Sequence, residues 1–100
     1  MLRTLPIQAV ARELMRHPGV VRWPYELSAA IKDAEGTIIR RGTVGRILVQ
    51  MENTGWLVSQ HEPKGSARGR AHRRYYTLTA NGLDGLAELL ELKDDRPVAV

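Results

Sequence analysis

The chain has 100 residues, a length that suits one domain with a core large enough to fold alone. Its hydrophobic content of 43% argues against disorder, and the absence of phenylalanine predicts a mostly aliphatic core. There is no cysteine, which excludes disulfides and thiolate catalysis and agrees with a reducing compartment. No apolar run approaches the ~18–20 residues that cross a bilayer, and the first residues do not resemble a signal peptide. We therefore expect a soluble, cytoplasmic protein without a membrane partner.

Positive charge is concentrated in the middle of the chain. The segment from Arg40 to Arg74 holds eight of the fifteen basic residues and only two of the eleven acidic ones, whereas the segment after it is acidic. A basic segment of this kind is typical of a surface that binds a polyanion. The plainer alternative is a solvated loop that binds nothing.

Two helices are expected in the first third of the chain. Apolar residues recur at i, i+3, i+4, i+7 and i+8 and predict a helix over residues 5–16. Thr4 is its expected N-cap, and Pro6 fits the first turn, where a missing N–H does no harm. A second helix should begin at Pro24, again a first-turn proline, and end at Glu35.

A third helix is expected over residues 41–54, stopped by Gly55. Its apolar residues keep helical spacing and should face the core. The opposite face should carry polar side chains: Thr43, Arg46, Gln50 and Asn53. The first three are suited to contacts with DNA base edges, and Arg40 and Arg41 at the start of the helix are suited to phosphates. An ordinary solvated helix face is the alternative.

A β-hairpin should follow, because residues 56–61 and 73–78 are rich in β-branched and aromatic side chains. The eleven residues between these strands include one proline, two glycines and a serine, which predict a flexible turn. The basic side chains in and beside this turn are Lys64, Arg68, Arg70 and Arg73. We expect them to lie along phosphates or to enter a minor groove.

The last helix should occupy residues 79–93, which completes a single domain over residues 1–93 and leaves a flexible tail at residues 94–100. Its leucines cover more surface than one helix face needs in a domain of this size. They are predicted to form a dimer interface: Leu83, Leu86, Leu89, Leu90 and Leu92. The alternative is a helix buried only within its own chain.

This order of elements predicts an α+β, mostly helical fold: a winged helix-turn-helix of three helices and a two-stranded wing, with a C-terminal dimerisation helix. Over roughly residues 5–92 the chain resembles the PadR-like transcriptional regulators, in their short form without a large C-terminal domain. The matching pieces are Tyr25-Glu26-Leu27, Gly42-Thr43-Val44, Arg46-Ile47-Leu48, Gly55-Trp56-Leu57-Val58 and Arg73-Arg74-Tyr75-Tyr76-Thr77-Leu78-Thr79, followed by Gly82.

The resemblance implies a homodimeric transcriptional regulator, typically a repressor, that binds a palindromic operator in double-stranded DNA. One position departs from the family, which usually has a tyrosine where this chain has Gly45. Members of the family often respond to small molecules, and an effector pocket lined by Trp23 and Trp56 stays open as a hypothesis.

Three other classes of function compete with DNA binding. A winged helix can act as a protein interaction module, in which case the basic wing would bind an acidic partner. RNA is less favoured, because Tyr75 and Tyr76 are adjacent on one strand and point to opposite faces instead of forming a stacking platform. An enzyme is not expected, since no acid–base pair is present and the three histidines lack metal-ligand spacing. We therefore expect no metal and no cofactor.

Overall fold

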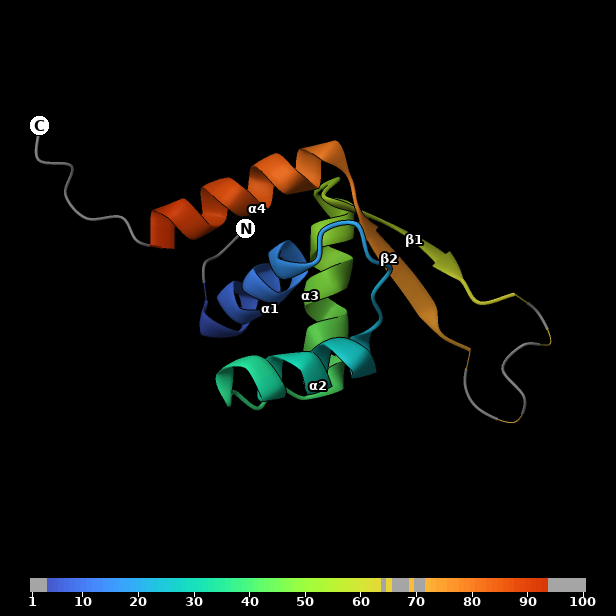
Figure 1. The fold of residues 1–100 in the computed structure, drawn as a ribbon. Coiled ribbons are helices and arrows are strands. Elements are labelled where there is room, and N and C mark those ends of the chain that lie inside the picture. The colour runs from blue at the N-terminus through green and yellow to red at the C-terminus, as the bar shows by residue number, and fades with distance from the viewer. Residues whose placement is uncertain (1–3, 64, 66–68, 70–71, 94–100) are drawn as a thin grey trace, which may run out of the picture.

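The computed structural model describes residues 4–63, 65, 69 and 72–93, which form four helices and one antiparallel pair of strands (Figure 1). The elements are α1 (Leu5–Arg16), α2 (Pro24–Glu35), α3 (Arg41–Asn53), β1 (Leu57–His61), β2 (Arg74–Leu78) and α4 (Ala80–Lys93). The prediction of an α+β winged helix is confirmed. The predicted tail at residues 94–100 and most of the predicted flexible turn lie outside the described residues. None of the described helices combines the length and apolarity needed to cross a membrane.

Local signals explain where the first two helices begin and end. Thr4 caps α1, since its hydroxyl accepts a hydrogen bond from the N–H of Ile7 at 3.4 Å. Both α1 and α2 have proline in the first turn. Gly36 closes α2 in the left-handed conformation, with φ of 71°, and its N–H donates to the carbonyl of Lys32 at 2.8 Å.

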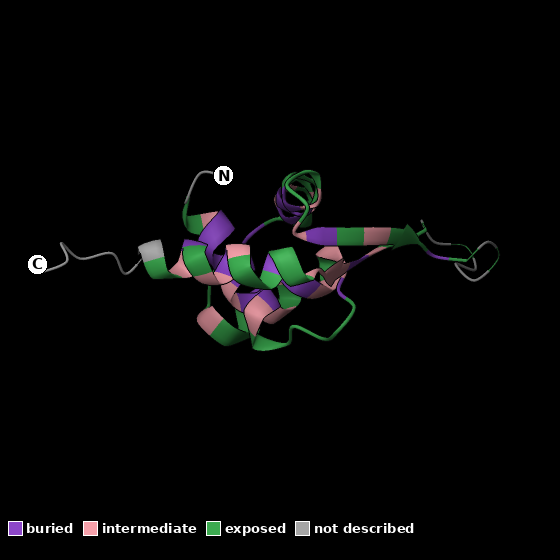
Figure 2. Ribbon diagram, turned by 90° about the horizontal axis from the view of Figure 1, so that it is seen from above, coloured by how far each residue is buried: buried purple, intermediate pink, exposed green. Residues whose placement is uncertain are grey.

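The core lies where the four helices meet the start of the wing, and burial of its apolar side chains provides most of the stabilisation. Figure 2 shows the buried residues on the inward sides of the helices, while the hairpin extends away from them. The largest fully buried side chains are aliphatic, as the composition predicts: Leu14, Leu27, Ile31, Leu48, Met51, Leu57, Leu86, Val10 and Val44. Tyr76 of β2 adds an aromatic ring to this core.

The wing is anchored to the segment between α1 and α2. Strand β1 pairs with β2 from Leu57↔Leu78 to His61↔Arg74. On the other side of β2, Arg22 exchanges two backbone hydrogen bonds with Tyr76, at 2.8 and 2.9 Å. A single residue of the connecting loop therefore acts as a third strand and fixes the base of the wing against the helices.

A charge network fixes this loop in turn. Arg22 is only 3% exposed, and its guanidinium donates to the carboxylates of Glu13 and Glu26 at 2.7–2.8 Å. Glu35 accepts hydrogen bonds from Arg12 and Arg16 at 2.7–2.9 Å, and these bonds, foremost those from Arg12, lower its pKa to about 2. The network joins α1 to α2.

Helix α4 is seated on Trp56, the residue just before β1. The Trp56 carbonyl accepts a hydrogen bond from the N–H of Thr79 at 3.0 Å. A Cβ atom at Gly82 would overlap this carbonyl oxygen, and a Cβ atom at Gly85 would lie 2.6 Å from Cζ2 of the indole ring. Glycine is therefore required at both positions for α4 to approach so closely.

Candidate nucleic-acid interface

Helix α3 buries one side in the core and presents the other to solvent. Its apolar residues at helical spacing are buried, as predicted: Val44, Ile47, Leu48 and Met51. On the outer side, Arg46 and Gln50 are exposed and Thr43 is half-buried. Nη2 of Arg46 lies 3.5 Å from the Thr43 hydroxyl oxygen. The core thus holds the helix rigidly while three hydrogen-bonding side chains face outward, an arrangement that can read base edges in a major groove.

The first turn of α3 carries two exposed cations. Arg40 is the residue before the helix and caps it without a side-chain hydrogen bond, and Arg41 begins the helix. Neither side chain is hydrogen-bonded or ion-paired to another described residue. Free backbone N–H groups and the helix dipole add positive potential here, so this end of α3 is suited to a phosphate group.

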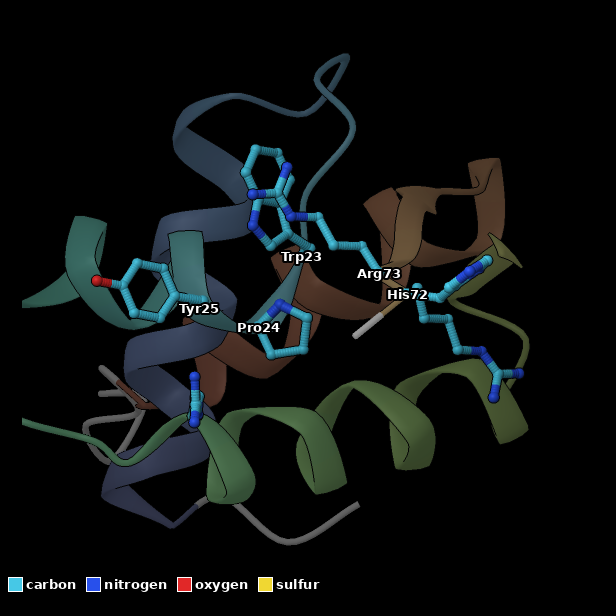
Figure 3. Close-up of a pocket in the computed structure, with 7 residues that line it drawn as sticks. Trp23, Pro24, Tyr25, His72 and Arg73 are labelled. Atoms are coloured by element: carbon cyan, nitrogen blue, oxygen red, sulfur yellow. The ribbon is translucent and has the colours of Figure 1, made fainter. Parts of the chain in front are cut away.

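A cleft of about 430 Å³ lies between the start of α2, the start of α3 and the base of the wing (Figure 3). It is lined by Trp23, Pro24, Tyr25, Arg41, His72, Arg73 and Arg74. In the close-up, Tyr25 and His72 lie on opposite sides of Pro24, and the side chain of Arg73 crosses the ring of Trp23. We call this the wing-base cleft.

Aromatic contacts order the wing-base cleft. The guanidinium carbon of Arg73 lies 4.7 Å from the centre of the Trp23 ring, a cation–π contact. Tyr75 meets the same ring edge-on, with centroids 5.4 Å apart and an interplanar angle of 81°. Stacking occupies the face of the Arg73 guanidinium and leaves the N–H groups at its edge available.

The electrostatics of the wing-base cleft favour an anion. None of the lining residues that the structure describes is acidic, and Arg41, Arg73 and Arg74 each bring a positive charge. Arg74 is partly neutralised, since it pairs with Glu52 of α3 at 3.2 Å. Arg41 and Arg73 therefore supply most of the uncompensated charge, and a phosphate is the chemistry that fits.

A second depression, of about 540 Å³, lies between α3 and β2 and is called the α3–wing groove. Its lining residues are Gly42, Gly45, Arg46, Val49, Gln50 and Tyr76. Two predicted base-contacting residues, Arg46 and Gln50, border this groove. The structure thereby brings the outer face of α3 next to the wing, although β2 follows α3 by some twenty residues in sequence.

The structure describes only part of the predicted wing surface. Of the predicted wing residues, Arg73 lies in the wing-base cleft, and three are outside the described residues: Lys64, Arg68 and Arg70. Sequence reasoning missed Tyr25 and Arg74 as cleft residues. Tyr25 is 65% exposed in the first turn of α2, and its place after a helix-starting proline was the available signal. Nothing in the sequence indicated the pairing of Arg74.

The predicted dimer leucines divide into two groups. Leu86 and Leu89 are buried in the chain's own core, at 0% and 5% exposure. Leu83 is 40% exposed and Leu90 is partly buried against the core, while the side chain of Leu92 lies outside the described residues. Of the predicted interface leucines whose side chains the structure describes, Leu83 therefore leaves the most surface for a partner.

The two tryptophans that might share an effector pocket have different surroundings. Trp23 lines the wing-base cleft, whereas Trp56 packs beneath α4 at Gly82 and Gly85.

Comparison with known proteins gives consistent results. The model of the transcriptional regulator PadR-like family matches residues 21–88. A PadR family transcriptional regulator from Eggerthella lenta DSM 2243 is 26% identical; the match covers 85% of this chain and 70% of that one, with a TM-score of 0.68. No curated protein sequence matches the chain.

Bacillus subtilis PadR, crystallised in complex with operator DNA, is 17% identical, with a TM-score of 0.71. This match covers 97% of the present chain but only 52% of that protein, so the chain spans about half of its length. A transcriptional regulator from Clostridium thermocellum is 19% identical over 88% of this chain and 79% of that one, with a TM-score of 0.67. At these identities the two likenesses support the fold.

Proposed function

The chain belongs to the PadR-like family of transcriptional regulators, and from this premise we propose that it binds specific sequences of double-stranded DNA as a homodimeric repressor. The observation that carries the proposal is the composition of the wing-base cleft. Arg41, at the start of α3, and Arg73, at the base of the wing, line one cavity although they are far apart in the chain. A DNA backbone passing this cavity would be held by both elements while α3 enters the adjacent major groove.

The side chains would divide the work of binding. Arg46, Gln50 and Thr43 would contact base edges and provide sequence preference. Arg40 and Arg41 would hold phosphates at the start of α3, and Arg73 would hold a phosphate from the wing. The three basic residues outside the described part of the wing would add affinity that does not depend on sequence: Lys64, Arg68 and Arg70.

The proposed dimer would pair through α4, with help from α1. Leu83 on α4 is 40% exposed, and Leu5 at the start of α1 is 78% exposed. Two copies related by a twofold axis would place their α3 helices in successive major grooves, ~34–36 Å apart, and would read a palindrome. The Bacillus subtilis relative was crystallised with operator DNA, which supports DNA as the partner.

A titration with random-sequence duplex DNA tests this function. Fluorescence anisotropy would be measured at 50 and 200 mM salt, and the bound pool would be sequenced. If the dimer makes ~6–10 phosphate contacts, affinity should fall by ~10³–10⁵ between these concentrations. Enrichment of a palindrome is the expected result. Salt-sensitive binding without enrichment would contradict sequence-specific regulation, and absence of binding at low salt would favour an acidic protein partner.

Three variants separate the roles of the side chains. Arg41→Ala should weaken binding to every sequence alike and reduce the salt slope by ~1, because one phosphate contact is lost. Arg46→Ala should instead reduce the preference for the selected sequence. Lys32→Ala is the charge control, since it removes one exposed cation from the last turn of α2. An equal effect of Arg41→Ala and Lys32→Ala would refute the role of the wing-base cleft.

A further inference from the structure

An apolar side chain interrupts the polar outer face of α3. Val49 is 40% exposed and lies in the α3–wing groove with Arg46 and Gln50. The ring of Tyr76, itself only 3% exposed, lines the groove from the side of the wing. Water therefore meets an apolar surface at the place where the proposed function requires contact with DNA bases.

The two glycines of the groove make this apolar surface reachable. Gly42, Gly45 and Val49 follow one another at helical spacing along α3, and a Cβ atom at Gly42 would meet nothing within 4 Å. At Gly45 it would meet only Cγ of Pro24, at 3.9 Å, an ordinary contact. Neither glycine has a positive φ. Neither backbone conformation nor packing within the described chain requires glycine, so the space beside Val49 is open to an approaching molecule.

We propose that Val49 is a specificity-determining residue that contacts the 5-methyl group of a thymine in the bound DNA. Thymine is the base that presents a methyl group in the major groove, and apolar side chains recognise it by contact. This inference rests on the proposed function, because it requires α3 to lie in a major groove. Charge complementarity favours DNA as the molecule that occupies the α3–wing groove. Arg46 borders the groove, and Arg40 and Arg41 lie at the start of the same helix.

The side chains beside Val49 on α3 are also suited to contacts with base edges. An A·T pair presents the adenine N6 and N7 atoms and the thymine methyl on one major-groove edge. The amide of Gln50 can pair with the adenine atoms, and the valine methyls can meet the thymine methyl. Arg46, one turn earlier on α3, is suited to a guanine. The operator is therefore expected to contain a contacted A·T pair near a contacted G·C pair in each half-site.

Replacing thymine by deoxyuridine tests the inference, because this change removes the methyl group and keeps every base-pairing hydrogen bond. The sequence enriched from the random pool would be synthesised with each thymine replaced in turn. One position in each half-site should weaken binding about fourfold, the effect of losing one buried methyl group at ~0.8 kcal/mol. In Val49→Ala, the ratio of affinities for the thymine and deoxyuridine forms should fall to about one at that position.

Two further variants complete the experiment. Val58→Ala makes the same chemical change at a valine of β1 that is 57% exposed, and it should leave the thymine-to-deoxyuridine ratio unchanged. Gly45→Leu adds a helix-favouring side chain to the groove, so it should preserve folding and remove the preference for thymine.

The outcomes separate the inference from the function on which it rests. Sequence-specific binding that tolerates deoxyuridine at every position overturns the role of Val49 and leaves the proposed function standing. The same holds if Val49→Ala and the wild type show equal ratios, or if Gly45→Leu keeps its preference for thymine. If the protein binds no duplex DNA at low salt, the proposed function is overturned, and the inferred contact between Val49 and thymine is overturned as well.

Discussion

Glycine at position 82 is expected to be essential for the seating of α4. A Cβ atom in Gly82→Ala would overlap the carbonyl oxygen of Trp56 and lie 2.9 Å from its carbonyl carbon. A backbone group cannot rotate away as a side chain can, so the start of α4 must move. That movement breaks the 3.0 Å hydrogen bond from the N–H of Thr79 to the same carbonyl.

The magnitude follows from three contributions. Forced overpacking costs about 1–3 kcal/mol, and the lost hydrogen bond contributes about 0.5–1.5 kcal/mol. The higher helix propensity of alanine offsets at most about 1 kcal/mol of this loss. The free energy of unfolding should therefore fall by about 2 kcal/mol, which lowers Tm by roughly 8–16 °C in a domain of this size.

Gly45→Ala provides the matched control, because it is the same substitution in another helix with no overlapping atom. It should raise the free energy of unfolding by about 0.5–1 kcal/mol through helix propensity alone. Thermal and urea unfolding would be followed by circular dichroism, with tryptophan fluorescence reporting on the seat of α4. The reasoning is refuted if Gly82→Ala is as stable as the wild type, or if Gly45→Ala is the more destabilised of the two.

Substitutions at three further residues test the contacts that hold α1, α2 and α4 in place. Arg22→Ala should cost about 3–5 kcal/mol in urea unfolding, because it leaves the buried carboxylate of Glu13 without its main partner; a double variant that also replaces Glu13 by glutamine should recover part of this loss. Glu35 has a pKa lowered to about 2, chiefly by its hydrogen bonds to Arg12, so its stabilisation is complete above about pH 4.5 and lost as pH falls toward 2. Stability measured between these values should therefore fall less steeply in Glu35→Gln than in the wild type, and equal slopes would contradict the assignment. Thr79→Ala should lower stability by about 1 kcal/mol through loss of the α4 cap, whereas Thr79→Ser should retain most of it; equal losses in both would show that the hydroxyl is not the cap.

The helices could be predicted from sequence because their signals are local. Apolar spacing set the period of α1 and α3, and Thr4 and Pro24 marked helix starts that the structure reproduces to within a residue. The outward placement of Arg46 followed from the same period. A helix period or a helix end can be predicted from the residues of its own segment, without knowledge of the rest of the fold.

The site depends on contacts that a single segment does not reveal. The wing-base cleft joins Trp23, Arg41 and Arg73, which come from three separate parts of the chain. Helical spacing alone assigns no role to Val49, because its place beside β2 is set by the way the wing folds back on α3. The leucine face of α4 is predicted to be buried against both its own domain and a partner copy, and within the chain Leu86 and Leu89 lie in its own core. Side-chain type gave no means of distinguishing these two environments.

Trp56 lies at the junction of α3, the wing and α4, the three elements that the proposed function requires. The N–H of Trp56 donates to the carbonyl of Met51 in α3 at 2.9 Å, and its carbonyl accepts from the N–H of Thr79 just before α4. Leu57, the next residue, begins the wing. Among the described residues, Trp56 thus links α3 directly to the start of α4 through backbone hydrogen bonds, so contacts around Trp56 set the relative angle of the two helices. In the proposed dimer, the spacing of the two recognition helices would therefore be determined by the same glycines that seat α4.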